Sequence, residues 1–168
     1  MAAFSLGTDT AGSGRVPAAL NCLVGYKPSL GAWSTKGVVP ACASLDCVTV
    51  FANSLEDAEK VNLAARGVDE ECCWSREYKE PLPKIPKKIC LAKDGVTFYG
   101  PYEDIYKAKW EQAKKRIEDM GITVEYIDYT MFSKAASILY DGPWVAERWK
   151  DLGDFVESHP GKVFPVTE

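Results

Sequence analysis

The sequence predicts an α/β fold, mainly because a strand–helix–strand pattern lies between residues 89 and 126. Apolar residues form a short run at 89–92 and recur at helical spacing from 102 to 120. They then alternate with other residues at 122, 124 and 126. A strand, a long amphipathic helix and a second strand favour a parallel pair joined by a crossover helix.

The length and charge of the chain exclude several classes of function. Its 168 residues suffice for one domain with a sizeable core. A net charge of −4 supplies no basic field for a phosphate backbone, so we expect no nucleic-acid partner. No apolar run approaches the ~18 residues that a membrane span needs, and the first residues do not resemble a signal peptide. We therefore expect a cytoplasmic protein without a membrane partner.

The first 26 residues predict short elements around a glycine-rich turn. Residues 7–14 contain three glycines and are expected to form the turn itself. Pro17 then fits the first turn of a short helix over residues 17–20, because proline lacks an N–H that this position leaves unused. A strand is expected at residues 23–26.

The next segment predicts buried strands followed by a helix. Two apolar, β-branched runs, at residues 38–39 and 47–51, are typical of buried strands or close-packed loops. Ser54 fits an N-cap, and apolar residues follow it at helical spacing until Gly67.

The remaining elements surround and follow the crossover helix. Three prolines among lysines predict an extended surface connection at residues 75–88. Pro101 begins the crossover helix and Gly121 is suited to its C-terminal cap. Two further helices are expected at residues 132–139 and 144–155, separated by a Gly-Pro turn.

Cysteine and histidine usage argues against a metal site. Six cysteines include no CxxC pair and there is one histidine, so we predict no metal and expect reduced, mostly buried thiols. Cys72 and Cys73 are adjacent in a polar stretch, where their thiols are candidates for reactivity. His159 is formally able to serve a Ser–His–Asp arrangement, but its Pro-Gly neighbours favour a solvated turn residue.

The glycine-rich segment around Ser13 is the candidate catalytic element. A serine hydroxyl becomes a nucleophile only where a base accepts its proton and N–H donors await the oxyanion. Glycines on both sides of Ser13 allow the backbone to approach a substrate, which suits acyl transfer. These three residues alone are equally compatible with a simple turn, and the P-loop, dinucleotide-binding and GxSxG patterns are absent from the sequence.

The longer string GTDTAGSGRVPA at residues 7–18, followed by GYKPS at residues 25–29, resembles the amidase signature family, whose patterns are GTDxGGSxRxPA and GxKPT. The resemblance implies an α/β/α sandwich with a mixed, twisted central sheet. It implies that Ser13 is the acyl-enzyme nucleophile and that no metal or organic cofactor takes part. The oxyanion-hole N–H groups and the loop-supporting pair that it implies are, respectively, those of Thr10, Ala11, Gly12 and Ser13, and the side chains of Asp9 and Arg15.

Two further strings, at residues 34–52 and 139–148, resemble the allophanate hydrolase branch of this family. Allophanate contains a ureido group joined to a carboxylate, which calls for a fork-shaped cation and a hydrogen-bonding aromatic residue. The resemblance assigns these roles to Arg148 and Tyr140. From the residues alone, a surface arginine and a core tyrosine remain open alternatives.

The resemblance also implies that the catalytic base lies outside this sequence. In the family a lysine acts through a second serine, and both precede the nucleophile by more than the 12 residues present here. We expect residues 1–168 to be a partial amidase domain, with the nucleophile loop and core strands at 1–53 and the βαβ unit and substrate-side helices at 54–168. The chain alone is expected to be inactive, with the rest of its own amidase domain as a partner.

The function implied is hydrolysis of allophanate, a small amide substrate, to ammonia and carbon dioxide in urea degradation. Fusion to a biotin-dependent urea carboxylase and formation of a homodimer are compatible with the resemblance. Two alternatives remain open: a general amidase or A-type amidotransferase chain, and a catalytically incomplete fragment that only binds a ligand or partner.

Overall fold

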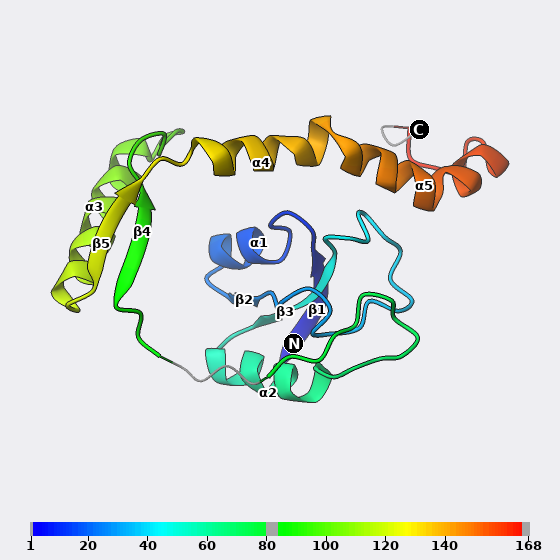
Figure 1. The fold of residues 1–168 in the computed structure, drawn as a ribbon, viewed down its shortest axis with the longest axis horizontal. Helices are drawn as coiled ribbons and strands as arrows, with labels where there is room; N and C mark the ends of the chain where they lie inside the picture. Colours follow the sequence, from blue (N-terminus) through cyan, green and yellow to red (C-terminus); the bar gives the residue numbers. More distant parts are fainter. Residues whose placement is uncertain (1, 80–83, 166–168) are drawn as a thin grey trace. The chain divides into compact units, whose positions relative to one another are not determined.

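The structure is a computed structural model that describes residues 2–79 and 84–165, with the backbone but not the side chains of residues 140 and 141. It contains both strands and helices, which confirms the predicted α/β class (Figure 1). The chain divides into two compact units, which are described separately. One comprises residues 1–80 and 139–168, and the other comprises residues 81–138.

The first unit contains a three-stranded antiparallel sheet. Its order is β1 (Phe4–Asp9), β3 (Cys47–Ala52) and β2 (Val24–Tyr26), so the strand latest in sequence lies in the centre. The expected strand at residues 23–26 is confirmed, whereas residues 7–9 belong to β1 and not to a turn. They are extended because β3 supplies cross-strand partners for all three, ending with Cys47 opposite Asp9.

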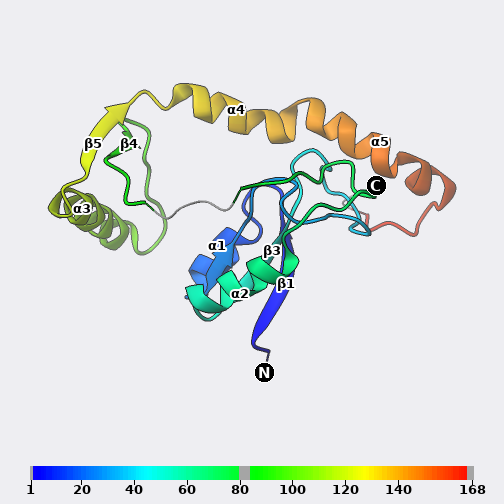
Figure 2. The same ribbon diagram turned by 60° about the horizontal axis from the view of Figure 1, so that its bottom comes forward.

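Two helices follow strands of this sheet. The short α1 (Arg15–Leu20) contacts β2, and α2 (Leu55–Ala65) contacts β2 and β3 (Figure 2). The predicted N-cap of α2 is confirmed, because the Ser54 side chain accepts a hydrogen bond from the N–H of Asp57. The core between sheet and helix consists of five residues with at most 9% exposure: Ala32, Trp33, Val50, Ala52 and Ala58.

The second unit confirms the predicted strand–helix–strand pattern. Strands β4 (Lys88–Ala92) and β5 (Thr123–Ile127) are parallel, and α3 (Glu103–Asp119) connects them (Figure 1). The apolar side of α3 differs from expectation: Tyr102, Ile105, Tyr106 and Met120 are each more than half exposed. Within the described residues no other element covers this side of the helix.

The C-terminal part forms the two predicted helices, α4 (Thr130–Asp141) and α5 (Pro143–Ser158). Gly142 is the N-cap of α5 and Pro143 its first residue, as the missing N–H of proline favours. The expected extended connection at residues 75–88 lies partly outside the described residues, because 80–83 are not described. Among the helices of residues 2–79 and 84–165, none is long and apolar enough to cross a membrane.

The sheet lies directly beneath the loop that follows β1. Thr49, on β3, is fully buried, and its hydroxyl has no hydrogen-bond partner among the described residues. A Cβ atom added at Gly14 would lie 2.7 Å from Thr49 Oγ1 and 3.1 Å from Thr49 Cβ, which is closer than real Cβ contacts. Gly14 therefore allows the loop to rest on β3.

We expect Gly14→Ala to lower the free energy of unfolding by about 1–3 kcal/mol, because the new methyl group overpacks against Thr49. Denaturant unfolding followed by circular dichroism would measure the change. Thr49→Ala is the matched second change: combined with Gly14→Ala it should restore part of the loss. Equal losses in the single and double variants would contradict the close contact.

Candidate active site

The candidate site is organised by the buried carboxylate of Asp9, at the end of β1. Asp9 is 0% exposed, yet it accepts five hydrogen bonds. Three come from backbone N–H groups, of Gly12 at 2.7 Å, Gly14 at 3.2 Å and Arg15 at 3.1 Å. The Arg15 guanidinium donates the other two, from Nε at 2.9 Å and Nη2 at 3.0 Å. The ion pair expected between Asp9 and Arg15 is thus present, and it is bidentate.

These contacts keep the carboxylate ionised. Burial alone would raise the pKa of Asp9, but the hydrogen bonds and charge of Arg15, with the backbone N–H of Gly12, lower it to about 2. At neutral pH Asp9 is therefore a fixed negative charge around which residues 10–14, here called the serine loop, are folded.

The serine loop presents its hydroxyl and part of its backbone outward. Ser13 is exposed, whereas its neighbours Gly12 and Gly14 are buried. Gly12 has a φ of +139°, a conformation that favours glycine. Its N–H is directed at Asp9, so it differs from the oxyanion donor that the resemblance implies. The N–H groups of Thr10, Ala11 and Ser13 have no acceptor among the residues the structure describes.

A second buried carboxylate, Asp46, joins the serine loop to residues 41–46, here called the 41–46 loop. The Thr10 hydroxyl donates to Asp46 Oδ1, and the N–H groups of Ala41 and Cys42 donate to Oδ2 at 2.8 and 3.0 Å. Asp46 is only 4% exposed. Sequence reasoning did not single it out, although a lone acid between apolar residues before a buried strand was an available signal.

The two residues predicted to bind substrate have different outcomes. Arg148, on α5, donates from Nε to the Ala41 carbonyl at 2.7 Å, so the structure brings it to the 41–46 loop. Its terminal nitrogen atoms make no hydrogen bond within the part of the chain that is described. The side chain of Tyr140 lies outside the described residues, and its role stays a prediction.

The alternative reactive residues are engaged elsewhere. His159 stacks on Phe155 at 4.4 Å, and its Nδ1 lies 3.0 Å from Ser158 Oγ. Burial would raise the pKa of the Cys72 thiol, but hydrogen bonds from Thr35 and a nearby backbone N–H lower it to about 7. All six cysteines are free, and three of them are buried: Cys42, Cys47 and Cys72. No group of three potential metal ligands occurs among the described residues.

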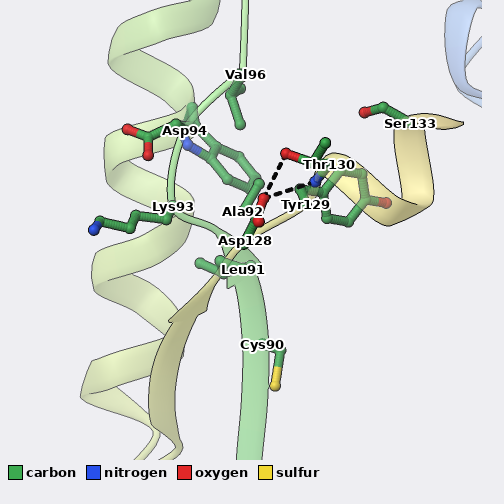
Figure 3. Close-up of a pocket in the computed structure, with 12 residues that line it drawn as sticks. Cys90, Leu91, Ala92, Lys93, Asp94, Val96, Asp128, Tyr129, Thr130 and Ser133 are labelled. Carbon is green, nitrogen blue, oxygen red and sulfur yellow. Dashed lines mark hydrogen bonds between the residues drawn. The ribbon is translucent and has the colours of Figure 1, made fainter.

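The second unit contains a cavity of about 870 Å³ at the carboxyl ends of β4 and β5 (Figure 3). Such an edge is a common ligand position in parallel sheets. Its acidic residue Asp128, however, accepts hydrogen bonds from the N–H and hydroxyl of Thr130 at 2.9 and 2.6 Å, at the beginning of α4. That carboxylate therefore has a structural role, and we assign no chemistry to the cavity.

Fold and site together define an α/β protein with a serine on a glycine-rich loop that a buried Asp–Arg pair supports. A family model described as Amidase matches residues 1–159. The chain belongs to the amidase family.

Three similar proteins place the chain more closely within this family. It is 44% identical over 163 residues to urea amidolyase of Lachancea kluyveri, covering 94% of this chain and 9% of that protein. It is 34% identical to the A-type chain of glutamyl-tRNA(Gln) amidotransferase from Latilactobacillus sakei, over 81% of this chain and 29% of that protein. The solved structure of Kluyveromyces lactis allophanate hydrolase matches with a TM-score of 0.84 and 43% identity, over 95% of this chain and 26% of that one.

We expect Asp9→Asn to lower the free energy of unfolding by about 2 kcal/mol at pH 7, because the lowered pKa of Asp9 measures the stabilisation of its charged form. This stabilisation is complete above the unfolded-state pKa, near 3.8, and is lost as the pH falls toward the folded-state value of about 2. The difference between wild type and variant should therefore shrink below about pH 4.

Denaturant titrations at several pH values would measure this difference. Glu56→Gln is the matched control, since Glu56 forms only an exposed helical pair with Lys60 and should change stability little. A difference for Asp9→Asn that is the same at pH 7 and pH 3 would contradict the role of its charge.

Proposed function

We propose that this chain is part of an amide hydrolase of the allophanate hydrolase type, with Ser13 as the nucleophile. The observation that supports it most is the exposed Ser13 on a loop whose flanking N–H groups are tied to Asp9. The names of the urea amidolyase and allophanate hydrolase relatives indicate the substrate. The chain spans only 9% and 26% of these two relatives, so the activity is proposed for the protein that contains it.

In the proposed reaction, Ser13 Oγ forms a bond to the terminal amide carbonyl carbon of allophanate while a base accepts its proton. The C–N bond breaks and ammonia leaves with that proton, after which water releases the acyl group from Ser13. The N–H groups of Thr10, Ala11 and Ser13 are positioned by their place in the serine loop to donate to the oxyanion. Gly12 supports the loop instead, because its N–H binds Asp9.

The base is proposed to come from outside residues 1–168, as the family resemblance implies. Among the described residues Ser13 Oγ has no hydrogen-bond partner, which is compatible with a base supplied by another segment. We accordingly propose a partial amidase domain in which residues 1–53 supply the nucleophile loop. A urea carboxylase on the same polypeptide and a cytoplasmic location are part of this proposal.

Arg148 is proposed to bind the carboxylate of allophanate. Its Nε is held by a backbone carbonyl, which fixes the guanidinium plane, while its terminal nitrogen atoms remain available to a planar anion. Tyr140 is proposed as its hydrogen-bonding partner toward substrate.

A second candidate function is that of an A-type amidotransferase chain. The 34% identity to the A-type chain of glutamyl-tRNA(Gln) amidotransferase favours it. The higher identity to urea amidolyase, over more of the chain, favours allophanate. Comparing ammonia release from allophanate and from glutamine separates the two.

We expect Ser13→Ala to reduce ammonia release from allophanate by at least about a thousandfold, because the bond-forming oxygen is removed. The assay should use the natural polypeptide that contains these residues. Ser5→Ala, a change at an exposed serine of β1, is the matched control and should retain activity. Turnover by Ser13→Ala at the wild-type rate would contradict the assignment.

We expect Arg148→Met to raise KM for allophanate by about 10- to 100-fold, the effect of losing a charge-assisted hydrogen bond to substrate. Activity on acetamide, which lacks a carboxylate, should change little. Arg116→Met, at an exposed position of α3, controls for the general loss of a cation. Equal effects on allophanate and acetamide would show that Arg148 does not read the carboxylate.

A further inference from the structure

Glu147, the neighbour of Arg148 on α5, holds the 41–46 loop from the same side. Its Oε1 accepts the N–H of Ser44 at 2.8 Å and its Oε2 accepts the Ser44 hydroxyl at 2.7 Å. Neither the composition nor the spacing of the sequence singled out this residue. The pKa of Glu147 is lowered, chiefly by these two hydrogen bonds, so the carboxylate is charged at neutral pH.

Two consecutive residues of α5 are therefore attached to one short loop. Glu147 binds it at Ser44, and Arg148 binds it at Ala41, while Asp46 closes the loop on itself and receives the Thr10 hydroxyl. Main-chain turns between Cys42 and residues 45 and 46 stiffen it further, with N–O distances of 2.9 and 2.8 Å. The chain of contacts runs from α5 through the 41–46 loop to the serine loop.

The use of Ser44 as the partner of Glu147 has an electrostatic consequence. Adjacent helical residues do not face each other, and Glu147 is engaged with neutral donors rather than with Arg148. No carboxylate lies within ion-pair distance of Arg148 among the described residues. The arginine therefore keeps its full charge toward an incoming anion, although its Nε is fixed by the Ala41 carbonyl.

We propose that Glu147 is a positioning residue for substrate recognition: it anchors the 41–46 loop so that the Ala41 carbonyl aims the Arg148 guanidinium at the substrate carboxylate. This inference rests on the proposed function. Glu147 acts through Arg148 and does not touch the reacting atoms, so its loss affects substrate binding more than chemistry. It predicts a change in KM for carboxylated amides that kcat does not share.

A double-mutant cycle in the natural polypeptide tests this. Glu147→Ala should raise KM for allophanate about tenfold with kcat changed less than about twofold, whereas adding Glu147→Ala to Arg148→Met should raise KM no further. Glu147→Gln should rescue most of the effect, since its amide can accept from the Ser44 N–H and donate to the Ser44 oxygen. Acetamide kinetics should be unchanged in every Glu147 variant.

Two further variants keep the test independent of folding. Ser44→Ala removes one of the two contacts without altering α5 and should raise KM by about threefold. Glu157→Gln, an exposed acid of α5, should leave KM unchanged. Thermal unfolding of each variant identifies any that do not fold.

The outcomes separate the two proposals. Wild-type turnover of allophanate with additive effects of Glu147→Ala and Arg148→Met, or with equal losses on acetamide, would overturn the positioning role and leave the proposed function intact. Absence of allophanate turnover by the wild-type polypeptide would overturn the proposed function and this inference with it. Wild-type turnover with a non-additive, allophanate-specific KM effect supports both.

Discussion

The buried charge of Asp9 is the constraint on which the serine loop depends. An isolated carboxylate taken out of water costs several kcal/mol, so it is retained in a fold only where donors surround it. The donors here are three N–H groups of residues 12–15 and the fork of Arg15. To deliver them, the chain must wrap around the carboxylate immediately after β1, and this wrapping directs Ser13 to the surface. The orientation of the serine thus follows from satisfying a charge that the serine itself does not contact.

The sequence predicts elements well where their signals are local. The N-cap Ser54, the C-terminal glycine of α3 and the strand–helix–strand pattern each lie within one element or its ends, and all are present. Residues 7–9 were expected in a turn because glycine-rich segments favour turns, but their strand partner lies about forty residues along the chain in β3. Antiparallel pairing over that separation leaves no periodic mark in the strand itself. The exposed apolar side of α3 likewise shows that periodicity predicts a face without predicting what packs on it.

The candidate site follows the same division. The motif around Ser13 indicates which residues take part, and the pair formed by Asp9 and Arg15 agrees with it. It does not indicate that the Gly12 N–H binds Asp9, because a backbone donor's direction depends on its φ and ψ and not on its residue type. Asp46 and Glu147 escape sequence reasoning for another reason. Their partners are main-chain groups and hydroxyls 36 and 103 residues away, and such contacts leave no spacing rule to recognise.

The use of main-chain partners explains how α5 is held without neutralising its cation. A direct ion pair between Arg148 and an acid of this chain would fix the side chain equally well, but it would also compete with an anionic substrate for the same guanidinium. A carbonyl holds the Nε with a dipole instead of a charge, and the acid that stabilises the loop is balanced by the N–H and hydroxyl of Ser44. The same solution recurs at Asp46, whose partners are two N–H groups and the Thr10 hydroxyl. Because neutral donors satisfy both acids, the loop between the serine and the arginine can be rigid while the arginine stays open to an anion.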